Sequence, residues 1–164
     1  MSVLRTIGTR CAAAIIAVGV GSTALAGSPA LAGTAADVPQ SFSADSGDAC
    51  RLGAARGTLV WHQPPAGRTV DGTATVSDRL PSPGCGDDGR HTVLVLTARA
   101  GGEAVDQEVL EADNGQRTYR FTLSAPVQVA EVVVRVCRRG PAGSYCGVAQ
   151  TLPAPIFTAS ASAV

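Results

Sequence analysis

The stretch PVQVAEVVVRVCRR, residues 126–139, decides the fold of this chain. Small or β-branched residues occupy its even positions, which are Ala130, Val132, Val134 and Val136. Charged residues alternate with them at Glu131 and Arg135, and a period of two predicts a β-strand with one face in a core. The stretch runs into Cys137, and Cys146 follows nine residues later, so the strongest strand leads directly into a potential disulfide.

Six further segments have strand character: residues 57–63, 70–78, 91–99, 103–110, 118–123 and 145–152. The middle of 91–99 is almost continuously apolar, which predicts a central strand, whereas the acidic segment 103–110 suits a sheet edge. The tripeptide Asp113-Asn114-Gly115 predicts a tight hairpin that joins 103–110 to the strand after it. No 3.6-residue period is evident after residue 32, so we expect an all-β fold of about seven strands.

This spacing of strands predicts an antiparallel β-sandwich. Cys50 precedes Trp61 by eleven residues, an interval that resembles the Cys-to-Trp interval of immunoglobulin domains, and the resemblance implies an immunoglobulin-like sandwich. Two features depart from that family. Cys85 comes sooner than its usual second cysteine, and Tyr145 lies one residue before Cys146, where the tyrosine corner requires two. A jelly roll or a related Greek-key barrel is the alternative.

The N-terminal residues 1–32 have the pattern of a signal peptide. Arg5 and Arg10 precede an apolar run at 11–20 that is too short to span a membrane. Small residues allow cleavage after Ala26 or after Ala32, and we favour Ala32. We expect a flexible leader at 33–49, a β-sandwich domain at 50–152 and a disordered tail at 153–164.

Removal of residues 1–32 leaves eleven arginines against thirteen acids, a formal charge of −2. This composition has no cluster of basic residues of the kind that binds nucleic acid. A second apolar stretch is absent from the sequence, so we expect no membrane insertion after the signal is removed. All thirteen basic residues of the chain are arginine, and Ala, Gly, Val and Pro are abundant. In this bias the chain resembles secreted proteins of high-GC Gram-positive bacteria, which implies an extracellular location.

Four cysteines remain after export: Cys50, Cys85, Cys137 and Cys146. In an oxidising compartment they predict two disulfides with three possible pairings, of which we favour Cys50–Cys85 with Cys137–Cys146. Loop-closure entropy gives each bridge roughly 3 to 4 kcal/mol of ideal stabilisation. The chain has no C-x-x-C motif and only two histidines, which argues against a zinc site.

The sequence offers little for catalysis. It contains no nucleophile elbow, no H-E-x-x-H and no P-loop, and its only neutral-range bases are His62 and His91. Both histidines fit solvated or capping positions better than a catalytic one. Only six aromatic residues are present, which leaves little platform for stacking sugars. We expect a protein without catalytic activity and without a cofactor.

Two local features offer alternatives. If Cys50 bonds Cys85, four carboxylates gather around that bridge as weak calcium candidates: Asp45, Asp48, Asp87 and Asp88. No EF-hand spacing is present, and solvated turn residues explain them better. The loop closed by Cys137 and Cys146 carries Arg138, Arg139 and Tyr145, which form a candidate binding loop. A rigid loop of this type resembles those of secreted protease inhibitors, whereas a plain structural clasp is the simpler interpretation.

The sequence therefore predicts a secreted, non-catalytic β-sandwich with two disulfides. We expect it to act as a binding or structural module toward an extracellular protein or a cell-surface partner. The alternatives are a protease inhibitor that uses the Cys137–Cys146 loop and a calcium-stabilised adhesion-type domain. The sequence indicates neither the partner nor the oligomeric state.

Overall fold

The computed structural model describes residues 36–64, 66–79 and 84–157. These residues form nine strands and no helix. The strands are β1 (Val38–Asp45), β2 (Gly53–Trp61), β3 (Thr69–Asp78), β4 (His91–Ala100), β5 (Glu103–Ala112), β6 (Gly115–Ser124), β7 (Glu131–Gly140), β8 (Gly143–Cys146) and β9 (Gln150–Pro153). The described part of the chain thus offers no helical membrane span. The signal peptide expected at 1–32 lies outside the described residues.

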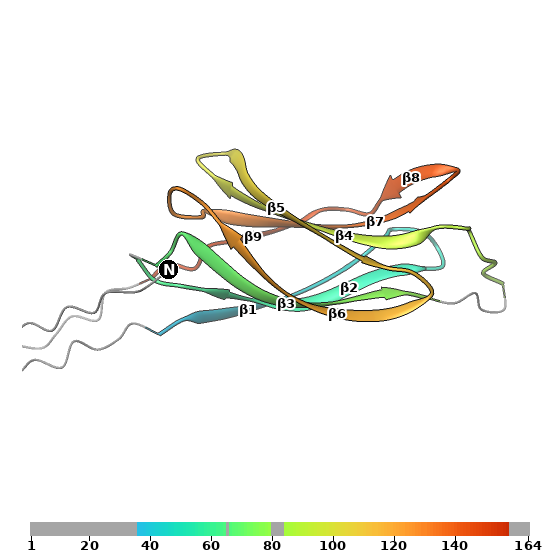
Figure 1. Ribbon diagram of the computed structural model, residues 1–164, viewed down its shortest axis with the longest axis horizontal. Coiled ribbons are helices and arrows are strands. Elements are labelled where there is room, and N and C mark those ends of the chain that lie inside the picture. Colours follow the sequence, from blue (N-terminus) through green and yellow to red (C-terminus); the bar gives the residue numbers. More distant parts are fainter. Residues whose placement is uncertain (1–35, 65, 80–83, 158–164) are drawn as a thin grey trace, which may run out of the picture. The chain divides into compact units, whose positions relative to one another are not determined.

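The strands form two antiparallel sheets, which Figure 1 shows as two layers. One sheet has the order β1-β2-β3-β6, and the other has the order β5-β4-β7, with β8 and β9 both pairing along the far side of β7. The prediction of an all-β antiparallel fold is confirmed. β4 is central and β5 lies at an edge, as their apolar and acidic sequences predicted.

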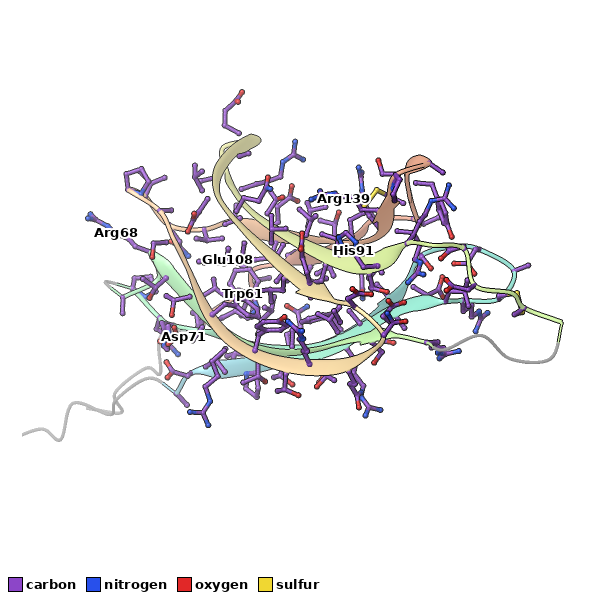
Figure 2. The ribbon with its side chains drawn as sticks, turned by 45° about the vertical axis from the view of Figure 1, so that its right-hand side comes forward. Trp61, Arg68, Asp71, His91, Glu108 and Arg139 are labelled. Carbon is purple, nitrogen blue, oxygen red and sulfur yellow. A yellow bond between two sulfur atoms is a disulfide. The ribbon has the colours of Figure 1, made fainter. Side chains whose placement is uncertain are left out.

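The core lies between the sheets and draws on both of them. The even-numbered valines of β7, Val132, Val134 and Val136, have no exposed surface, so the alternation that predicted this strand also predicts its buried face. Trp61 fills the space between the layers at the end of β2, as Figure 2 shows, and is 2% exposed. Its indole N–H donates to Oε1 of Gln40 at 2.9 Å, which satisfies its one polar group.

The sequence predicted a flexible leader at 33–49. That prediction is wrong for Val38–Asp45, because these residues form β1 at the edge of the four-stranded sheet. The strand has one large apolar residue, Phe42, between Ser41 and Ser43, and this short polar pattern gave no strand signal. Phe42 packs over Gly57 on the paired strand. A Cβ atom at Gly57 would lie 2.6 Å from the Phe42 ring, so glycine makes room for the ring.

The turn at Asp113-Asn114-Gly115 is tight, and Asn114 adopts a positive φ of 50°. The expected hairpin pairing is nevertheless wrong, because β5 and β6 belong to different sheets and β6 pairs with β3. The backbone N–H of Asn114 donates to Oδ2 of Asp78 at the end of β3, 3.0 Å away. That bond holds the turn against the four-stranded sheet and directs the chain across the sandwich.

The expected last strand, 145–152, is divided into β8 and β9. The interruption includes Gly147, where a Cβ atom would lie 2.0 Å from the carbonyl oxygen of Asp45, so the approach of β1 requires glycine here. The disordered tail expected from residue 153 is wrong for its first part. Ala154 donates its N–H to the carbonyl of Ala130 at 2.8 Å, and Phe157 packs against the core. Residues 158–164 lie outside the described part.

Candidate functional site

Both favoured disulfides are present. Cys137 and Cys146 lie directly opposite each other in the β7–β8 ladder, so their bridge closes a hairpin. Cys50, in the turn before β2, bonds Cys85 in the connection between β3 and β4. The pairing chosen from sequence is confirmed, and both bridges are consistent with an oxidising compartment.

Arg138 is 2% exposed, so its expected role in an exposed binding loop is wrong. The reason is the alternation of side chains along β7, whose even-numbered residues face the core. Arg138 is even-numbered like Val134 and Val136, and its side chain therefore points into the sandwich. Charged side chains are almost never fully buried unless they are paired, and the partners of Arg138 are distant in sequence.

The guanidinium of Arg138 uses all five of its N–H groups. Nη1 donates to Oδ1 of Asp78 and to Oγ1 of Thr92, the latter at 2.8 Å. Nη2 donates to Oδ1 of Asp88 at 2.5 Å and to the carbonyl of Arg90 at 2.6 Å, and Nε donates to Oδ2 of Asp88 at 3.3 Å. This arginine cluster ties the end of β3, the start of β4 and the end of β7 together.

Tyr145 and Arg90 close the outer side of the arginine cluster. The hydroxyl of Tyr145 donates to Oδ2 of Asp88 at 3.3 Å, and the guanidinium carbon of Arg90 lies 5.4 Å from the centre of the Tyr145 ring. Arg90 also donates from Nε to the carbonyl of Gly143 at 3.3 Å and lies 3.8 Å from Asp88. Two arginines thus face two carboxylates, and the β7–β8 hairpin is fastened to the β3–β4 connection.

The ionisation of the arginine cluster follows from these contacts. The hydrogen bonds from Arg138 lower the pKa of the Asp88 carboxyl. Burial alone would lower the pKa of Arg138, but the hydrogen bonds and charges of Asp88 and Asp78 outweigh it and raise that pKa. Burial, together with the nearby charges of Asp48 and Asp88, raises the pKa of Tyr145. The cluster therefore keeps its arginine charged and its tyrosine neutral.

Arg139, the neighbour of Arg138, points to the outer side of the five-stranded sheet (Figure 2), and its side chain is 53% exposed. Its Nη1 lies 3.4 Å from Oε1 of Glu111, and its backbone is paired with His91 on one side and Ser144 on the other. A protease would have to pull this strand out of its ladder to cleave after Arg139. The hairpin has the geometry of a structural clasp.

The four calcium candidates are turned to other partners. Asp45, Asp48 and Asp87 each accept a hydrogen bond from a backbone N–H within four residues, at 2.8 to 3.1 Å. Asp88 binds Arg138. Within residues 36–64, 66–79 and 84–157, no three His, Cys, Asp or Glu side chains come together as a ligand group for a metal. Asp45, Asp48 and Asp87 are thus arranged as turn-capping residues.

His62 lies just after β2 between two carboxylates, and we call this the histidine cluster. Its Nδ1 is 3.0 Å from Oδ1 of Asp37, and its Nε2 is 2.9 Å from Oδ2 of Asp71. The hydrogen bonds to Asp71 and then Asp37 raise the pKa of His62, and the bonds from Thr122 and His62 lower that of Asp71. With both ring nitrogens engaged by carboxylates, His62 has no free nitrogen with which to act as a general base.

The outward side of the four-stranded sheet is rich in hydroxyl groups, and we call it the hydroxyl face. Its serines and threonines are Ser41, Ser43, Thr58, Thr69, Thr73, Thr75, Ser77, Thr118, Thr122 and Ser124. They stand in rows across the strands, because Ser41 is paired with Thr58 and Thr58 with Thr73. In the next row, the hydroxyls of Thr75 and Thr118 are 3.1 Å apart.

Three hollows follow one another across the hydroxyl face. The largest, about 620 Å³, is lined mainly by Thr58, Asp71, Thr73, Arg120 and Thr122, together with Val60, Gly72 and Phe121. It shares Thr58 and Thr73 with a hollow of about 330 Å³. That hollow in turn shares Arg56 with a third, of about 320 Å³, which extends to Arg79. Each hollow thus shares lining residues with the next, and we call the row of three hollows the track.

The outward side of the five-stranded sheet, the valine face, is different. Val95, Val109 and Val133 lie on it, and Val95 and Val133 help to line a hollow of about 440 Å³ that reaches the Cys137–Cys146 bridge. Its charged residues are largely paired with one another, as Arg99 is with Glu131 at 3.4 Å. Among the described arginines of this face, Arg135 has no carboxylate within 4 Å.

The hydroxyl face is not apparent from the sequence. The alternation of Thr73 and Thr75 in one strand, and of Thr118 and Thr122 in another, is visible in the sequence. Nothing in the local pattern indicates that these strands pair across about forty residues to form one surface.

No protein-family model, no curated protein and no solved structure matches the chain.

Proposed function

We propose that this protein is an exported, non-catalytic, immunoglobulin-like domain that binds an extracellular partner through its hydroxyl face. The signal-like pattern of residues 1–32 and the two disulfides support export.

The strand order supports the immunoglobulin-like assignment. β2, β3 and β6 take the places of strands A, B and E of that fold, and β4, β7 and β9 take those of C, F and G. β1 is then an additional edge strand. The disulfides differ from those of antibody domains, because Cys50 precedes β2 while Trp61 ends it, roughly 30 Å away along an extended strand. Trp61 is instead packed without a disulfide beside it.

The track on the hydroxyl face carries the proposal. It combines hydroxyl groups with exposed arginines, of which Arg56 and Arg120 lie on strands and Arg79 directly follows β3. Sites on strands hold their side chains more firmly than sites on loops, so less entropy is lost on binding. The arginine cluster and both disulfides hold one end of the sandwich, and the histidine cluster joins β2, β3 and the segment before β1 at the other.

The two alternatives receive less support. An inhibitor loop would retain only Arg139, which is paired with Glu111 and held in a ladder on both sides. A calcium site would need carboxylates that already cap turns or bind Arg138. The occupied nitrogens of His62 likewise favour a binding role over catalysis.

A tryptophan placed on each outward face tests the proposal. Thr73→Trp would block the centre of the hydroxyl face, and Thr97→Trp is the matched control on the valine face. Retention would be measured on an immobilised panel of neutral glycans, anionic glycans and extracellular proteins. We expect at least one of them to retain the unmodified protein and T97W, and to bind T73W at least about tenfold more weakly. Equal retention of both variants, selective loss in T97W, or no retention at all would reject the proposal.

A further inference from the structure

We propose that the ligand of the hydroxyl face is an extended anionic polymer of sugars or polyols, which the arginines hold by its carboxylate or phosphate groups. The inference rests on the proposed function and specifies its ligand.

The first support is the charge of the track. Arg56, Arg79 and Arg120 are exposed, and no carboxylate of the described residues lies within 4 Å of their nitrogens. The one acid that lines the largest hollow, Asp71, is already engaged at both oxygens. Thr122 donates to its Oδ1 at 2.6 Å, and His62 lies 2.9 Å from its Oδ2. The three arginines outnumber the one or two net negative charges of Asp37, His62 and Asp71 together, so the face keeps a net positive charge, which favours an anionic ligand.

The second support is the spacing of the arginines. Arg56 and Arg120 are two strands and two residues apart in the register, which places their Cα atoms about 12 Å apart. Arg79 lies one strand away and four residues further along, about 14 Å from Arg56. A single small anion cannot reach two such arginines at once. An extended chain with repeated charges can reach them, and it would lie along the track.

The third support is the chemistry between the arginines. Serine and threonine hydroxyls both donate and accept hydrogen bonds, as the hydroxyls of a sugar do. Most outward-pointing side chains of this face are polar; Pro39, Ala54 and Val60 are apolar, and none is aromatic. Unpaired nucleotides would therefore find no outward aromatic side chain on which to stack. These features favour a polyhydroxylated anion over a single-stranded nucleic acid.

The test measures the affinity of the oxidised protein, without residues 1–32, for polygalacturonate, poly(glycerol phosphate) and neutral dextran. We expect one or both anionic polymers to bind and dextran not to bind, with affinity falling between about 50 and 300 mM salt. Arg56→Gln and Arg120→Gln should each weaken binding about tenfold, because each removes one charge-assisted contact. The matched control Arg135→Gln, on the valine face, should bind unchanged. The stronger of the two polymers identifies carboxylate or phosphate as the recognised group.

Three results would overturn the inference: failure of both anionic polymers to bind, binding of dextran as strong as theirs, or equal weakening by R135Q and R56Q. The variants also separate this inference from the proposed function. A neutral glycan whose binding is lost in T73W but kept in R56Q would leave the hydroxyl face as the binding surface and refute its anionic ligand. An anionic polymer that binds T73W and the unmodified protein equally would refute both.

Discussion

The arginine cluster and the histidine cluster both hold one cation between two carboxylates, yet they differ in burial and in chemistry. Arg138 is 2% exposed between Asp78 and Asp88, whereas the side chain of His62 is 20% exposed between Asp37 and Asp71. An arginine does not lose its proton in a protein, while a histidine titrates near neutral pH.

The difference shows how one fold fixes its two ends by different means. In the arginine cluster, Arg90 supplies a second cation, so two arginines balance two carboxylates. The histidine cluster has a single titratable cation for two carboxylates, and it carries one net negative charge when His62 is protonated and two when it is not. The arginine cluster therefore stays charged and paired at neutral and basic pH. The ion pairs of the histidine cluster weaken as the pH rises, because His62 loses its proton.

The largest effect should come from the buried cation. Arg138→Met leaves Asp78, which is 4% exposed, without its charged partner, and breaking a buried pair in this way costs about 3 to 5 kcal/mol. Arg139→Met is the matched control, because its pair with Glu111 is exposed and should contribute less than about 1 kcal/mol. Urea unfolding of both variants would measure the difference. Equal losses in the two variants would show that Arg138 does not hold this end of the sandwich.

A smaller effect is expected from a hydroxyl that binds Arg138. Thr92→Val keeps the shape of the side chain but removes the acceptor 2.8 Å from Nη1, which leaves a buried N–H unsatisfied. The loss in the free energy of unfolding should be about 1 to 2 kcal/mol. Thr97→Val, on the outward side of the same strand, should change it by less than about 0.5 kcal/mol. If T92V left the free energy of unfolding unchanged, the hydrogen bond from Arg138 to Thr92 would not contribute to stability.

The smallest effect should come from the histidine cluster and should depend on pH. Because Asp71 and Asp37 raise the pKa of folded His62 above 6.5, its stabilisation is complete below that value and is lost as the pH rises through the folded pKa. His62→Gln should remove this decline, which we expect to be at most about 1 kcal/mol for a partly exposed pair. Thermal unfolding from about pH 5 to pH 9 would measure it.

Asp88 supplies an internal reference when the pH series is extended down to about pH 2. Arg138 lowers its folded pKa below 3.8, so its contribution is present above that value and is lost as the pH falls through the folded pKa. H62Q should keep this part of the acid limb and lose only the part that His62 contributes by lowering the pKa of Asp71. If H62Q kept the decline above neutral pH, that decline would have to come from another group.

The sequence predicted the elements whose information is local. The alternating valines of β7 predicted both its strand and its buried face, and the nine-residue spacing of Cys137 and Cys146 indicated their bridge. β1 was missed because a polar edge strand with one large apolar residue, Phe42, resembles a linker.

The candidate sites depend on long-range pairing, which the sequence does not display. The parity of β7 already placed Arg138 on the inner face, but its partners Asp78 and Asp88 lie 60 and 50 residues away. Without knowledge of those partners, an arginine beside a disulfide hairpin is expected to be exposed. The hydroxyl face likewise exists only because β3 pairs with β6, across two intervening strands.

The most direct test of the central claim, that the hydroxyl face is the binding surface, is a pair of NMR titrations of the isotope-labelled protein, one with polygalacturonate and one with poly(glycerol phosphate). With at least one of these polymers, we predict that the amide shifts change around Thr58, Thr73 and Arg120, and that those around Val95 and Val133 do not. Changes centred on the valine face or on the β7–β8 hairpin, or no changes with either polymer, would contradict the claim.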